Sequence, residues 1–163
     1  MKKCLFILFS AIAFVACSNE EDPRPEAAHI DYDFRLSENT LNTFYMDFCY
    51  SVNGKKDTIR TSNRMSGRIH TSNLPTTFEG KIQITPKTDA TGNELSYSLS
   101  VDVKSVSARK GTEVDGGWQT INSDGYKEVI DTKNITDLQA FADSFNLASK
   151  VHSYVVSADG KVK

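Results

Sequence analysis

The chain has 163 residues, of which 39% are hydrophobic and 25% are charged. This length suits one domain with a real core, because chains of this size bury roughly two-thirds of the surface that they expose when unfolded. The formal net charge is −2 and the 19 basic residues are dispersed. This composition argues against nucleic acid as a partner.

Residues 1–16 have the order of charged, apolar and small residues that marks an export signal. The apolar run 5–15 is shorter than the roughly 20 residues that a helix needs to cross a bilayer. Small residues then surround Cys17. The pattern predicts a signal peptide that is cleaved before Cys17. Cleavage after Ala13 and a short buried helix are the alternatives.

The segment Val15-Ala16-Cys17-Ser18 resembles the lipobox of bacterial lipoproteins. The acidic residues 20–22 behind it resemble the stretch that follows the cysteine in Bacteroidetes-type surface lipoproteins. The resemblance implies that Cys17 carries the lipid, with acyl chains such as palmitate, and holds the protein in the outer membrane. It also implies that the protein faces the cell exterior. The periplasmic face of that membrane is the alternative.

Polar residues and two prolines, Pro23 and Pro25, predict a stiff lipidated tether over 17–28. Residues 29–163 are predicted to form a single β-rich domain. Cys49 is then the one cysteine left in that domain, so no intramolecular disulfide is expected. A lone strand cysteine is expected to be a small packing residue.

Apolar and polar residues alternate with a period of two in several segments, which is typical of half-buried strands. A bulge or a strand end is expected near Ser105, where the alternation breaks. The segment 61–76 is expected to be a long connection or an irregular edge. The clearest predicted strands are 30–36, 44–52, 78–84 and 95–103.

Two hairpins are expected. The dipeptide Asn53-Gly54 predicts a tight turn, and a return strand near 57–61 places Ile59 on the aromatic face of its partner. Strands 118–121 and 126–130 predict a second hairpin, joined by Asn122-Ser123-Asp124-Gly125.

One helix is predicted near the C-terminus. Thr136 and Gln139 have the spacing of a capping box, and an apolar stripe follows over 138–148. A last strand is expected at 151–157. Seven or eight strands and one late helix predict an antiparallel β-sandwich, with the helix over an open edge or the end of the core. A lipocalin-like β-barrel is the alternative.

No cofactor, metal site or catalytic residue is predicted. His29, His70 and His152 are too scattered for ligand spacing, and no nucleophile elbow or phosphate loop occurs. Trp118 is the one candidate ligand contact, because an exposed indole can stack on a sugar ring. The alternative is that Trp118 enters the core.

These patterns favour a lipid-anchored protein of the cell envelope that is not an enzyme. We expect a surface binding or adhesion module whose partners are the membrane, through Cys17, and a glycan or protein ligand. A structural envelope subunit or a small inhibitor protein is the second interpretation. An unrecognised hydrolase is the third.

Overall fold

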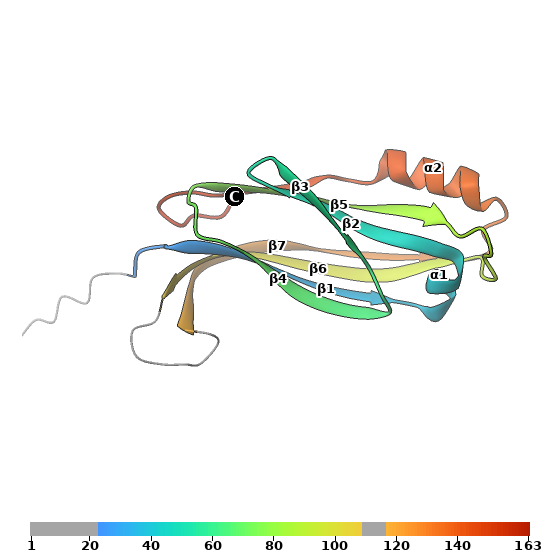
Figure 1. Cartoon of the computed structure of the whole chain (residues 1–163), viewed down its shortest axis with the longest axis horizontal. Coiled ribbons are helices and arrows are strands. Elements are labelled where there is room, and N and C mark those ends of the chain that lie inside the picture. The colour runs from blue at the N-terminus through green and yellow to red at the C-terminus, as the bar shows by residue number, and fades with distance from the viewer. Residues whose placement is uncertain (1–22, 109–116) are drawn as a thin grey trace, which may run out of the picture.

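A computed structural model describes residues 23–108 and 117–163. The predicted signal peptide and Cys17 lie outside the described residues. The described chain forms two four-stranded antiparallel sheets and two helices (Figure 1). The start of β1 and the curled ends of β6 and β7 lie at one end of the molecule, and the helices lie toward the other.

The first sheet has the strand order β4-β1-β6-β7, and the second has the order β3-β2-β5-β8. In the first sheet the bounds are β4 (Arg64–Thr71), β1 (Ala27–Leu36), β6 (Leu95–Ala108) and β7 (Trp118–Thr132). In the second they are β3 (Lys55–Arg60), β2 (Phe44–Val52), β5 (Thr76–Pro86) and β8 (His152–Val156). The helices are α1 (Glu38–Thr43) and α2 (Leu138–Ala148).

The core lies between the two sheets and is built from the alternate residues that the period of two predicts. Phe34 of the first sheet meets Phe48 of the second with ring centroids 5.4 Å apart. Gly80 leaves room for the rings of Phe48 and Phe78, since a Cβ there would lie 2.9 Å from Phe48 and 3.0 Å from Phe78. The described strands form two separate sheets, which confirms the sandwich. The lipocalin-like barrel is therefore wrong.

The first predicted hairpin is confirmed. Asn53 and Gly54 have φ angles of 52° and 78°, and Val52 pairs directly with Lys55. The two-residue turn uses the positive φ angles that this dipeptide tolerates. Ile59 lies opposite Phe48, on the aromatic face.

The segment 61–76, expected to be a long connection or an irregular edge, contains a regular edge strand, β4, over half of its length. This strand pairs with β1 and turns Met65, Gly67 and Ile69 toward the other sheet. Gly67 interrupts the apolar alternation because a Cβ at this position would lie 2.2 Å from the hydroxyl of Tyr32. The ring on β1 fills the space that a β4 side chain would otherwise occupy.

The second predicted hairpin is also wrong. Residues 118–132 form one continuous strand, β7, that pairs with β6 along its length. The turn signal at 122–125 is overridden because a long neighbouring strand offers backbone partners throughout, with Gly125 opposite Asp102. The irregularity expected near Ser105 is confirmed as a bulge between Ser105 and Val106.

The predicted C-terminal helix is confirmed as α2, although Asp137 rather than Thr136 caps it by accepting from the backbone N–H of Ala140. A short helix, α1, was not predicted from the sequence. Along the part of β5 that β8 does not reach, α2 covers the edge. No helix within the described ranges has the length and apolar character needed to span a membrane.

Side chains at α2, rather than a strand, make hydrogen bonds to the backbone of β5 along this edge. Asn146 accepts from the N–H of Ile84 and donates to its carbonyl, both at 2.8 Å. Ser149 donates to the carbonyl of Ile82 at 2.7 Å. These bonds satisfy backbone groups that would otherwise lie under the helix without partners.

We expect Asn146→Ala to lower the free energy of unfolding by about 1–3 kcal/mol, because it leaves both backbone groups of Ile84 without a protein partner. Asp143→Ala, an exposed change on the same helix, is the control and should cost no more than about 0.5 kcal/mol. Urea unfolding measures both. Equal stability of the two variants would contradict the role given to Asn146.

Candidate binding face

The outer face of the first sheet carries polar side chains in transverse rows, because the antiparallel register aligns residues of β4, β1 and β6. We call six of these residues the polar face: Asp31, Asp33, Ser66, Arg68, Ser100 and Asp102. Across the sheet, Asp31 lies between Arg68 and Asp102, and Asp33 lies between Ser66 and Ser100.

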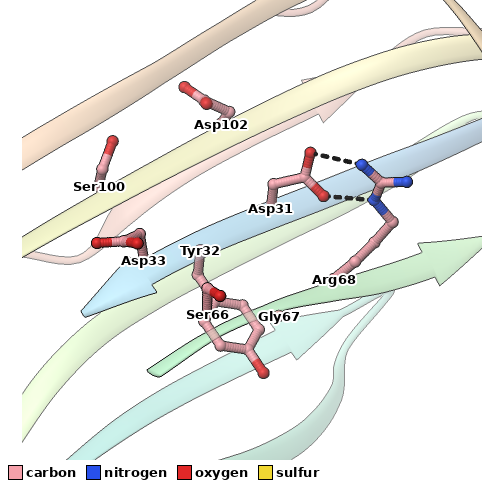
Figure 2. A pocket seen from close by; sticks show the side chains of 8 residues that line it. All are labelled: Asp31, Tyr32, Asp33, Ser66, Gly67, Arg68, Ser100 and Asp102. Carbon is pink, nitrogen blue, oxygen red and sulfur yellow. Dashed lines mark hydrogen bonds and ion pairs between the residues drawn. The ribbon is translucent and has the colours of Figure 1, made fainter. Parts of the chain in front are cut away.

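Ion pairs hold the middle of the polar face in place (Figure 2). The guanidinium of Arg68 donates to both carboxylate oxygens of Asp31, at 2.5 and 3.0 Å. The amine of Lys104 lies 2.8 Å from the same carboxylate. Burial of Asp31 opposes its ionisation, but the hydrogen bonds from Arg68 and Lys104 outweigh it and hold the pKa of Asp31 below its usual value.

A hollow of about 410 Å³ opens on this face, lined by the polar face together with Tyr32 and Gly67. Its lining offers carboxylates, hydroxyls and a guanidinium, and includes no histidine or cysteine. Such a surface can hold a polar ligand by hydrogen bonds in several directions.

One row further along, three rings form a compact group that we call the His–Trp cluster: His29, His70 and Trp118. Nε2 of His29 lies 3.0 Å from Nδ1 of His70. The indole meets the ring of His29 edge-on and that of His70 at a tilt, with its centroid 5.3 and 5.4 Å from theirs. Trp118 is half-buried on the outer face. The alternative expectation, that it enters the core, is therefore wrong.

His29 is only 2% exposed. Burial, followed by the positive charge of Arg68 and by His70, lowers the pKa of His29 to about 4. Lys104 acts in the same direction, and Asp31 opposes it. The imidazole is therefore neutral at pH 7 and shares a hydrogen bond with its neighbour.

The third histidine, His152, lies on β8, at the edge of the sandwich where β7 of the first sheet faces β8 of the second. The ring of His152 stacks on Tyr126 with centroids 3.6 Å apart. Its Nε2 lies 3.8 Å from a carboxylate oxygen of Glu128, which is longer than a hydrogen bond. Glu128 instead accepts from the hydroxyl of Tyr97. Burial and then Lys150 lower the pKa of His152, while Glu128 opposes this shift.

Cys49 is a free, half-buried thiol on the outer face of the second sheet. Its Sγ donates to Oε1 of Gln83 at 3.1 Å. Within residues 23–108 and 117–163, no group of three or more histidine, cysteine, aspartate or glutamate side chains could hold a metal ion.

Sequence reasoning missed the His–Trp cluster. His29 and His70 lie 41 residues apart and meet because β1 pairs with β4, the strand that was not predicted. The apolar residues Met65 and Ile69 were the available signal for this strand. Once it is paired with β1, His70 falls opposite His29.

The chain matches no protein-family model, no characterised protein and no solved structure.

We expect the stability of the protein to fall as the pH drops from about 6.5 to 4. In that interval the unfolded chain binds a proton at His29 before the folded protein does, since the folded pKa is about 4 against 6.5 for a free histidine. The full effect is roughly 3 kcal/mol, present above pH 6.5 and lost below pH 4.

Unfolding in urea at several pH values, followed by the fluorescence of Trp118, measures this loss. His29→Gln keeps a hydrogen-bonding amide that does not titrate, so its stability should fall less over the same interval. His152→Gln is the matched control and should retain the effect of His29. Identical pH dependence in the wild type and His29→Gln would contradict the assignment.

Proposed function

We propose that this protein is a non-catalytic binding module of the bacterial cell envelope, anchored in the outer membrane by a lipid on Cys17 and facing the cell exterior. The polar face carries the binding part of this proposal. Its central residues, Asp31 and Arg68, are held by ion pairs before any ligand arrives, which reduces the entropy that binding must overcome.

The tether supports the same arrangement. Residues 18–26 separate Cys17 from Ala27, the first residue of β1, and this stretch spans at most about 35 Å when fully extended. β1 enters the fold at the end of the sandwich near the curled tips of β6 and β7 (Figure 1). A lipid on Cys17 would thus place the His–Trp cluster nearer the membrane and the helices farther from it.

A hydroxyl-rich ligand such as a glycan suits the polar face best. Sugar hydroxyls both donate and accept, and this face alternates acceptors such as Asp102 with donors such as Arg68 and with the hydroxyls of Ser66 and Ser100. Trp118, in the neighbouring His–Trp cluster, adds an aromatic ring beside the polar face. A protein ligand is the other outcome that a binding screen can return.

Removal of the lipid attachment site tests the anchor. We expect Cys17→Ala to move the protein from the membrane fraction to the soluble fraction of the producing cell, because the lipid is its proposed membrane contact. Cys49→Ala, which leaves Cys17 intact, should stay in the membrane fraction. Membrane retention of Cys17→Ala would rule out the proposed anchor.

Substitution in the hollow tests the binding face. On a glycan array followed by titration of any glycan bound, Asp102→Ala should weaken binding about 10- to 100-fold, the effect of losing a hydrogen bond to a charged group. Glu79→Ala removes a carboxylate from a hollow of similar size on the second sheet and should leave binding unchanged. Equal affinity of wild type and Asp102→Ala would exclude this face.

A further inference from the structure

The sheet edges of this sandwich are protected in different ways, and β7 is the exception. β4 carries two arginines, and β3 is short and rich in lysine. Alongside β8 runs the C-terminal tail, with the backbone groups of Val155 and Lys163 exchanging hydrogen bonds of 2.9 and 3.1 Å. Charged, short or covered edges of this kind prevent unwanted strand pairing.

β7 is 15 residues long, and in the described part of the chain it pairs with β6 alone. Its outward side chains include Lys127, Val129 and Asp131, all exposed. Val129 is 62% exposed although it is apolar. A long edge strand that exposes an apolar side chain is a template for another strand.

We propose that the second edge of β7 pairs with β7 of a second copy of this chain. An antiparallel pair related by a two-fold axis through Val129 places the two Val129 side chains opposite each other. The same axis places each Lys127 opposite Asp131 of the second copy. The outward side chains of Lys127, Val129 and Asp131 are thus complementary to themselves in apolar contact and in charge.

The charges are available for this pairing. The contact of Asp131 within its own chain is with Lys133 at 3.9 Å, and both side chains are more than half exposed. Such a surface pair is weak and can be exchanged for a cross-strand pair. Because the axis is two-fold, the pair between Lys127 and Asp131 forms twice.

The resulting dimer has a continuous eight-stranded sheet, and the polar faces of the two copies lie side by side on one surface of it. A single pair of edge strands buries less area than most specific interfaces, so the association is weak in dilute solution. Attachment to one membrane would raise the effective concentration of the copies, and a dimer could then bind a repeating ligand at two points. This consequence rests on the proposed function, whereas the pairing itself does not.

Disulfide trapping tests the pairing in the full chain with Cys4, Cys17 and Cys49 replaced by serine. Directly opposite residues of an antiparallel pair have Cα atoms about 4.5–5.5 Å apart, within the range of a disulfide. Val129→Cys should therefore give a covalent dimer under mild oxidation. Two copies of Lys127→Cys would be offset by about 13 Å along the strands and should not be linked.

Val151→Cys replaces an exposed valine elsewhere, 52% exposed, and serves as the collision control. Linkage of Val129→Cys no faster than Val151→Cys would overturn the proposal. Because this chain has no Cys17, the result is independent of the anchor and of any ligand.

Charge exchange gives a second, independent measurement by sedimentation equilibrium of the same cysteine-free chain. Asp131→Lys sets like charges opposite each other twice and should weaken self-association about tenfold. The double variant Lys127→Asp with Asp131→Lys restores opposite charges and should return the affinity to within about threefold of the parent. Circular dichroism checks that each variant is folded. A monomeric parent at every concentration, or no rescue by the double variant, would overturn the pairing.

Discussion

The register of β1 between β4 and β6 is the constraint on which most of this structure depends. It turns Ile30 and Phe34 into the core and, on the other face, aligns Asp31 with Arg68 and Asp102. A slip of one residue would exchange the two faces of the strand and place charged side chains in the core. Burial of one face therefore also specifies the arrangement of polar groups on the other.

The edges of the sheets set a second constraint, because backbone groups there have no neighbouring strand to pair with. Along β5, the side-chain amide of Asn146 on α2 makes the backbone hydrogen bonds that a neighbouring strand would make. Along β8, the C-terminal tail makes them. The side chains of Tyr126 and His152 close the gap between the sheets at β7 and β8. β7 has an aromatic cover on its inner side, while its second backbone edge has no strand partner in the described residues.

Sequence patterns predicted the elements whose signals are local. The turn at Asn53-Gly54, the alternation of β6 and the apolar stripe of α2 each depend on residues within one short segment. Prediction failed where a distant neighbour decided the outcome. Tyr32 fills the space above Gly67 and hides the alternation of β4, and β6 keeps β7 extended through a sequence that otherwise favours a turn.

By itself, the sequence determined the class of fold and the buried face of most strands, and it carries the prediction of a lipid anchor at Cys17. These depend on composition, on period and on short motifs. Tertiary structure alone decided the polar face, the His–Trp cluster and the half-buried place of Trp118 on the outer surface. The physical reason is separation along the chain. Asp31 meets partners 37 and 73 residues away, and such contacts depend on which strands pair and in what register, which no local pattern specifies.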